Sequence, residues 1–340
     1  MTRGDCNVKR FVPFLVCAAM FTLLSCKEAG NSQTKAAEAV KEPPASDPEK
    51  IQPAGTWGKP NELYPVLKGG KWGYVNNTGK MVIEPQFLMA GRFTDDLAMV
   101  VEAKKKKVGY IDRDGKFAIE PKFDGGGPFS EGFAAFYMNK KAGVIDKTGK
   151  TVLEPKFHRI GRFHEGLAVA VVATQLRDRV VYDCGYIDYK GKVVIIPQYE
   201  SACTAFSEGL AGIRKLGQLW SFIDTKGNTA IQPAYFALGQ FGEGIAAASA
   251  ENSRWGFIDK SGNWAITPRY EQAGYFSDGR ATAIGVGGKL WGYIDKSGGF
   301  VIKQQFSFAE PFQDGIALVQ VGKKVGYIDR DGKYVWPLGE

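Results

Sequence analysis

The stretch Trp291-Gly292-Tyr293-Ile294-Asp295-Lys296-Ser297-Gly298 decides the fold, because similar stretches recur along the whole chain. The other copies begin at Trp72, Val108, Ala142, Cys184, Trp220, Trp255 and Val325, so eight starts lie 36, 34, 42, 36, 35, 36 and 34 residues apart. Such regular spacing is typical of a repeat protein in which each copy folds as one small unit. The interval of 42 residues contains an insertion, Thr174–Asp183, that we expect to form a surface loop.

Each copy opens with two predicted strands joined by a tight turn. The first strand, as in Trp291–Ile294, alternates large and small side chains and leads into Asp295, with Gly298 three residues later. An Asp supplies a hydrogen-bond acceptor and a Gly supplies the positive φ that such turns use. The second strand, as in Phe300–Ile302, is rich in β-branched residues. We expect the proline near its end to stop it; these prolines are Pro85, Pro121, Pro155, Pro197, Pro233 and Pro268.

An irregular connector with two aromatic anchors follows, as at Phe157 and Phe163, and a third predicted strand then begins at Gly166–Ala168. Leu63–Leu67 resembles a third strand without its predecessors, whereas the last copy, Val325–Trp336, has only the first two strands. Regrouped as third, first and second strand, the chain holds eight three-stranded meanders. One such meander has too small a core to be stable alone, so the units must stack. We therefore predict an all-β tandem repeat, as a propeller-like closed ring or an open β-solenoid.

The N-terminal region predicts export. Residues 1–25 combine basic side chains with a short apolar run, the layout of a signal peptide, and the run is too short to span a bilayer. Leu23-Leu24-Ser25-Cys26 resembles the lipobox of bacterial lipoproteins, which implies lipidation, such as palmitate, at Cys26. Residues 26–62 contain few large apolar side chains and predict a flexible tether. Residues 63–340 then form the repeat domain, so we expect a membrane partner through the N-terminal lipid and a location in the cell envelope.

The repeat also resembles a known family. The pattern W-G-[YF]-I-D-x-x-G-x-x-x-I-x-P, followed by F-x-E-G-x-A, is similar to the WG, or KWG, repeat of bacterial exported proteins, and covers about Leu63 to Glu340. Some copies depart from it: Val108, Ala142, Cys184 and Val325 replace Trp, and Ser221 replaces Gly. The resemblance implies the fold class and the exported setting, and it implies no activity.

Charge and cysteine usage limit the partners. The chain has 44 Lys and Arg against 36 Asp and Glu, and without the signal peptide the balance is 41 against 35. Lysines at predicted turns, above all Lys104–Lys107, indicate solvation of sheet edges, with a polyanion site as the alternative. We expect no nucleic-acid partner for an exported protein. In the repeat domain only Cys184 and Cys203 remain, as a local disulfide or as two buried thiols.

No arrangement typical of catalysis or of a cofactor stands out. His158 and His164 lie in one connector beside Glu165, where loop decoration competes with a metal pair. Asp112-Arg113-Asp114-Gly115 lacks the later ligands of a calcium loop and predicts a hairpin turn. Carboxylates such as Glu120 and Asp124 are not marked out as a glycosidase pair. We expect no metal, no cofactor and no enzyme activity.

The best sequence candidates for ligand contact are aromatic. Trp72, Trp220, Trp255 and Trp291 occupy one equivalent position, either as a row of stacking faces for sugars or as core between repeats. The sequence thus predicts an envelope-anchored, non-catalytic surface that binds a protein or glycan. The alternatives are a structural envelope component without a specific ligand and, least favoured, a glycan hydrolase.

Overall fold

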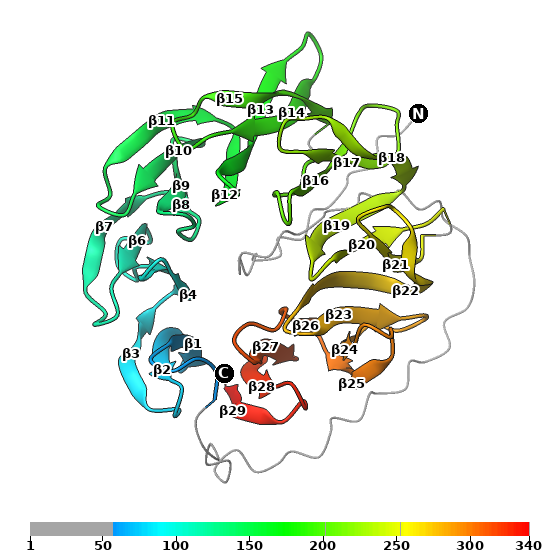
Figure 1. The fold of residues 1–340 in the computed structure, drawn as a ribbon. Helices are drawn as coiled ribbons and strands as arrows, with labels where there is room; N and C mark the ends of the chain where they lie inside the picture. Colours follow the sequence, from blue (N-terminus) through cyan, green and yellow to red (C-terminus); the bar gives the residue numbers. More distant parts are fainter. Residues whose placement is uncertain (1–56, 201, 252, 340) are drawn as a thin grey trace, which may run out of the picture. The chain divides into compact units, whose positions relative to one another are not determined.

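The computed structural model describes residues 57–200, 202–251 and 253–339, and these belong to one compact unit. The predicted signal peptide, Cys26 and most of the predicted tether lie outside the described residues. The prediction of an all-β repeat is confirmed, because the described residues form 29 strands arranged in seven antiparallel sheets (Figure 1). Within the described ranges no helix is long and apolar enough to cross a membrane.

The sheets follow the order of the chain, and we number their repeat units one to eight. Unit one is β1 (Leu63–Lys68), β2 (Lys71–Asn76) and β3 (Met81–Phe87); unit two is β4 (Met89–Thr94), β5 (Leu97–Val101), β6 (Val108–Ile111) and β7 (Phe117–Phe123). Unit three is β8 (Gly125–Gly126), β9 (Phe133–Met138), β10 (Lys141–Asp146) and β11 (Thr151–Phe157); unit four is β12 (Arg159–His164), β13 (Leu167–Gln175), β14 (Val180–Ile187) and β15 (Val193–Glu200). Unit five is β16 (Leu210–Arg214), β17 (Trp220–Asp224) and β18 (Thr229–Tyr235).

Units six and seven share one seven-stranded sheet. It contains β19 (Ala237–Gly242), β20 (Ile245–Ser249), β21 (Trp255–Asp259), β22 (Trp264–Ser277), β23 (Arg280–Gly285), β24 (Trp291–Ile294) and β25 (Phe300–Phe306). The long β22 ends unit six and starts unit seven. Unit eight is β26 (Phe308–Ala309), β27 (Ile316–Val321), β28 (Lys324–Asp329) and β29 (Tyr334–Gly339).

The predicted three-stranded meander is one strand short in most units. The segment expected to be an irregular connector forms a further strand, such as β4 or β12, which pairs with the predicted third strand. Arg159 faces Val171 and His164 faces Leu167, with a bulge between them. That bulge hides the alternation by which a strand is recognised in sequence. Only units one and five keep three-stranded sheets.

The predicted surface loop at the insertion is also largely strand. Thr174 and Gln175 extend β13, and Val180–Asp183 extend β14, so the insertion lengthens one hairpin (Figure 1). Leu176 at its tip is 42% exposed. The insertion therefore lies on the surface, as expected, but continues the ladder instead of leaving it.

The turn chemistry predicted from Asp and Gly is confirmed. Asp295 accepts hydrogen bonds through Oδ1 from the backbone N–H groups of Ser297 and Gly299, and Gly298 has a φ of 80°. The same pattern recurs at Asn76, Asp112, Asp146, Asp188, Asp224, Asp259 and Asp329. These side chains are accounted for as turn formers.

The prolines do not stop the second strand, contrary to the prediction. Pro85 lies inside β3, in a bulge between the pairs Tyr74–Ile83 and Trp72–Phe87. An edge strand tolerates a proline at a bulge because no ladder hydrogen bond is lost there. The backbone comes so close that a Cβ on Gly73 would lie 2.4 Å from the Ile83 carbonyl oxygen. The Gly of each W-G pair therefore fits the bulge opposite.

The core is divided among the joints between consecutive units. For example, Trp72 and Phe87 of unit one pack in one cluster with Phe93 and Val100 of unit two. The first and last units also meet: Tyr64 of β1 and Tyr327 of β28 share a buried cluster. The Tyr327 hydroxyl donates to the Pro65 carbonyl at 3.0 Å, across 262 residues of sequence. The first and last units of the repeat domain are therefore in contact.

Candidate binding site

Carboxylates at the start of units two to seven bind the backbone of the next unit. They lie in tight turns, such as Glu131-Gly132, in which both residues have positive φ. Glu131 accepts from the Gly166 N–H at 2.9 Å, and Glu243 accepts from the Gly279 N–H at 2.8 Å. Equivalent bonds join Asp95 to Gly132, Glu165 to Gly209, Glu208 to Gly244 and Asp278 to Gly315. This clamp explains the Glu and Gly of the F-x-E-G-x-A pattern.

A basic side chain completes the clamp at several joints. Lys260 lies 3.1 Å from Glu208, Lys296 lies 3.2 Å from Glu243, and Arg330 lies 3.4 Å from Asp278. Burial tends to raise the pKa of Glu208, but the Gly244 N–H and the Lys260 ammonium outweigh it and hold that pKa below its usual value. The three carboxylates are therefore engaged in structure by a backbone N–H and a basic side chain.

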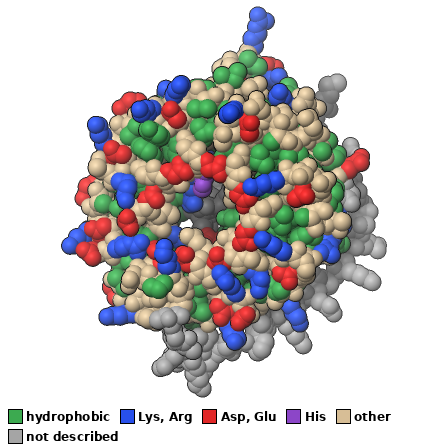
Figure 2. Space-filling view, in the orientation of Figure 1, with side chains coloured by type: hydrophobic (Ala, Val, Ile, Leu, Met, Phe, Trp, Pro, Cys, Tyr) green, Lys and Arg blue, Asp and Glu red, His purple; other side chains and the backbone are tan. Residues whose placement is uncertain are grey.

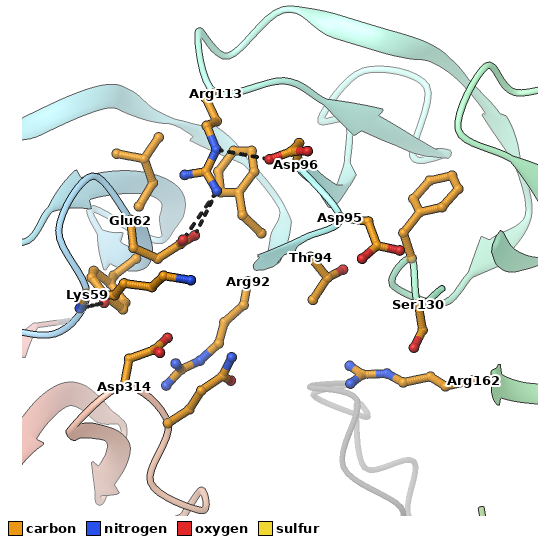
Figure 3. A pocket seen from close by; sticks show the side chains of 15 residues that line it. Lys59, Glu62, Arg92, Thr94, Asp95, Asp96, Arg113, Ser130, Arg162 and Asp314 are labelled. Carbon is orange, nitrogen blue, oxygen red and sulfur yellow. Dashed lines mark hydrogen bonds and ion pairs between the residues drawn. The ribbon is translucent and has the colours of Figure 1, made fainter. Parts of the chain in front are cut away.

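A cavity of about 390 Å³ lies beside the first of these turns, among units one, two, three, four and eight (Figure 3). This volume lies within the usual range for small-molecule sites. Charged and polar side chains dominate its wall. The lining residues are Lys59, Glu62, Leu63, Tyr64, Arg92, Phe93, Thr94, Asp95, Asp96, Arg113, Phe129, Ser130, Arg162, Gln313 and Asp314.

Most of the acidic groups on this wall already have partners. Arg113 binds Glu62 at 3.2 Å and lies 3.8 Å from Asp96, which also pairs with Lys147 at 3.4 Å. Asp95 accepts from the Gly132 N–H at 2.7 Å. Positive charge from Arg92 and Arg162 is therefore less compensated than a simple count of charges suggests.

Arg92 is held firmly but incompletely paired. Its guanidinium lies 5.9 Å from the Tyr64 ring centroid and 5.7 Å from that of Tyr327. Its Nε lies 3.7 Å from Glu310, longer than a hydrogen bond. Its Nη2 is buried and has no hydrogen-bond partner among the described residues. Such an unsatisfied donor is costly unless another group reaches it.

Arg162 approaches the same space from unit four. Figure 3 shows its guanidinium directed into the cavity, on the side opposite Arg92. Its side chain is exposed, and no ion pair or hydrogen bond joins it to another residue in the described part of the chain. Both arginines act on Glu310: burial raises the pKa of Glu310, and Arg92 and Arg162 oppose that rise. The two cations thus face a shared region.

The four tryptophans of the predicted row lie at the joints between units and differ in exposure. Trp72 and Trp220 are 6% and 4% exposed and lie in the cores between units. Trp255 and Trp291 are half-buried and pack against the neighbouring clusters. In all four units the large ring packs at the joint between sheets, beside the Gly bulge.

Cys184 and Cys203 form a disulfide in the structure, with their Cα atoms 6.2 Å apart. It joins β14 of unit four to the segment before β16 of unit five. The two histidines have different surroundings. The His158 ring packs on the Tyr182 ring, with 4.6 Å between the ring centroids. His164 is half-buried, and burial and Arg162 lower its pKa. No group of three or more metal-ligating side chains occurs in the described ranges.

Sequence reasoning missed the two arginines, although a signal for them exists. Gly91-Arg92-Phe93 and Gly161-Arg162-Phe163 are the same tripeptide at equivalent places of two units. Other units have Pro128, Gln240 or Tyr275 before the Phe. A position that varies while its neighbours repeat is a candidate for contact with a ligand instead of a fold requirement.

Comparison with known proteins decides the family. The family described as WG containing repeat matches residues 72–105, 109–141, 143–172, 185–218, 220–252, 255–289 and 291–324. The chain belongs to this WG repeat family. The seven matches agree with seven of the eight sequence copies, and the eighth, from Val325, is the copy with two predicted strands only. No curated protein matches the sequence.

Several solved structures resemble the WG repeat chain at low identity. The computationally designed Ika8 protein has a TM-score of 0.48 and 14% identity, covering 82% of this chain and 97% of its own. BamB from Moraxella catarrhalis has a TM-score of 0.46 and 10% identity, covering 83% and 92%. Kluyveromyces lactis Hsv2 has a TM-score of 0.42 and 10% identity, covering 69% and 90%. These likenesses indicate nothing about what this chain binds.

Proposed function

We propose that this WG repeat protein is an envelope-anchored, non-catalytic binding protein whose ligand is a glycan, held in the cavity beside Arg92. The single observation that supports this best is the polar cavity itself, where Arg92 Nη2 is buried without a partner. A polar wall with charged, hydroxyl and amide groups suits a hydroxylated ligand better than an apolar protein surface. Of the two partner classes, the cavity therefore favours a glycan.

The proposal includes a closed, propeller-like ring of eight units. The bond from Tyr327 to Pro65 and the shared cluster of Tyr64 and Tyr327 support closure. Arg92 of unit two also lies near Glu310 of unit eight. Closure would make the cavity a permanent feature, because units from both ends of the chain line it.

Binding instead of catalysis is favoured by what the carboxylates do. The acidic groups that the repeats share are occupied by backbone N–H groups of the next unit. A general acid or base needs a free carboxyl in reach of its substrate. Retention of a glycan at the cavity needs only the polar wall.

Co-sedimentation with purified peptidoglycan sacculi tests the function, using the full chain in detergent. We expect saturable retention that Gln313→Trp abolishes, because Gln313 is exposed on the cavity wall and a Trp would fill the space. Gln198→Trp, on the exposed face of β15, is the matched control. Equal retention of both variants, or release of soluble sugar fragments by the wild-type protein, would overturn the proposal.

The anchor is tested separately. We propose that Cys26 carries the lipid, as the Leu23–Cys26 stretch suggests. The substitution Cys26→Ala should move the protein from the membrane fraction to the soluble fraction of lysed cells. Membrane retention of this variant after a high-salt wash contradicts lipid anchoring at Cys26.

A further inference from the structure

We propose that the ligand of this cavity carries an acidic group, a carboxylate or a phosphate ester on a sugar, and that Arg92 and Arg162 bind that group. The inference rests on the proposed function and deepens it by naming the chemistry of the ligand. The geometry of the two guanidinium groups carries it.

The two arginines come from different units and converge. Arg92 lies on β4 of unit two and Arg162 on β12 of unit four, and Figure 3 shows both side chains directed into the cavity. Like charges repel, so their convergence is unfavourable unless an anion lies near them. Glu310 is the described acidic residue nearest to Arg92, and at 3.7 Å it makes an ion pair without a good hydrogen bond.

The position of Arg92 is fixed in advance. The rings of Tyr64 and Tyr327 lie at 5.9 and 5.7 Å from its guanidinium, so little conformational freedom remains to be lost when a ligand binds. Its Nη2 is buried without a hydrogen-bond partner, and the Arg92 side chain lines the cavity, where its charge faces a bound oxyanion. A guanidinium matches the two oxygens of a carboxylate or phosphate group.

Three of the four acidic side chains on the wall, all except Asp314, are held by other groups. Asp95 is bound by the Gly132 N–H, and Glu62 and Asp96 are bound by Arg113. Ser130 donates to the Phe163 carbonyl at 2.6 Å, which places its hydroxyl beside the strand of Arg162. Hydroxyl and amide groups such as Ser130 and Gln313 would then face the neutral part of a sugar.

Isothermal titration calorimetry of the full chain in detergent tests the inference, with glucuronic acid, glucose 6-phosphate and glucose as probes. We expect the acidic sugars to bind at least tenfold more tightly than glucose, and the stronger of the two identifies carboxylate or phosphate as the preferred group. Arg92→Gln and Arg162→Gln should each weaken acidic-sugar binding about tenfold, because each variant loses one charge-assisted hydrogen bond to the acidic group. Arg159→Gln, an exposed arginine on the same strand β12, should leave it unchanged.

A gain-of-affinity variant makes the test independent of folding defects. Glu310→Gln removes the carboxylate beside Arg92, so acidic sugars should bind more tightly to this variant. Equal affinity for glucose and the acidic sugars, or no binding of any probe, overturns the inference. Retention on sacculi that Gln313→Trp still abolishes would at the same time leave the proposed function standing. An effect of Arg159→Gln as large as that of Arg162→Gln also overturns it, because surface charge would then explain binding.

Discussion

The joint between units five and six contains an ion pair, whereas the joint between units four and five has a disulfide in its place. In the later joint, Glu208 is held by the Gly244 N–H and by Lys260. In the earlier one, Glu165 is held by the Gly209 N–H, but the residue equivalent to Lys260 is Thr225. The disulfide between Cys184 and Cys203 crosses this joint instead. A covalent link thus stands where the usual clamp lacks its cation.

The units of this fold therefore differ mainly at the joints between sheets, and much less within the sheets. Each sheet keeps the same turn and the same bulge, whereas the side chains between sheets change. The joint of units three and four shows a third solution, because Tyr189 replaces the basic residue and stacks on Phe133 at 4.8 Å. Irregular joints lie next to one another, on the side of the domain that also supplies Arg162.

The largest effect is expected from removing the disulfide. The double substitution Cys184→Ala and Cys203→Ala should lower the free energy of unfolding by about 3 kcal/mol, because the bond closes a loop of 19 residues that is otherwise free in the unfolded chain. Urea unfolding of both proteins measures it. The wild-type protein in reductant should behave like the double variant, and an unchanged midpoint in reductant would contradict a stabilising bond.

A smaller loss is expected at the bulge inside a sheet. In Gly256→Ala the new Cβ would lie 2.4 Å from the Ile266 carbonyl oxygen, so the edge strand must move, at a cost of about 2 kcal/mol. Ser221 occupies the equivalent position of β17, so the variant should still fold. Gly161→Ala, where the nearest atom lies 3.6 Å away, should change little. Equal denaturation midpoints for the two variants would show that the bulge does not need glycine.

The bulge glycine and the disulfide could be predicted from the sequence to different degrees. The Gly of W-G repeats visibly, but its reason, the close approach of the paired strand, requires the register. Cys184 and Cys203 fall within one repeat spacing, yet the sequence left the disulfide and two free thiols equally open. Local patterns predicted the turns at Asp295 and its equivalents because the interacting groups are four residues apart or less.

What the sequence did not predict depends on groups far apart in the chain. Glu208 and Lys260 are 52 residues apart, and Arg92 and Glu310 come from opposite ends of the domain. The strand β4 was missed because its bulge interrupts the two-residue alternation. The cavity was missed for both reasons, since its residues lie in such strands and in several units.

The clamp in which Glu208 binds both the Gly244 N–H and Lys260 should make a smaller, pH-dependent contribution. Glu208→Gln should lower the free energy of unfolding by about 1 kcal/mol at neutral pH, because it removes the charge that binds Lys260 and weakens the bond from Gly244. The folded state lowers the pKa of Glu208, so this stabilisation is present above its ordinary value of 4.5 and is lost as pH falls below it. Unfolding curves from pH 7 to pH 3 should converge for the two proteins. A constant difference across that range would exclude the charge as the cause.

The smallest effect is expected from supplying the missing cation at the joint of units four and five. Thr225→Lys places an ammonium where Lys260 lies in the next unit, and pairing with Glu165 should raise the free energy of unfolding by about 0.5 kcal/mol. The gain should disappear in about 1 M salt, which screens exposed charges. Thr225→Met is the control of similar length without charge. If the double cysteine variant gains no more from Thr225→Lys than the disulfide-bonded protein, then the disulfide and the ion pair are independent. A larger gain in the double cysteine variant means that each can replace the other at this joint.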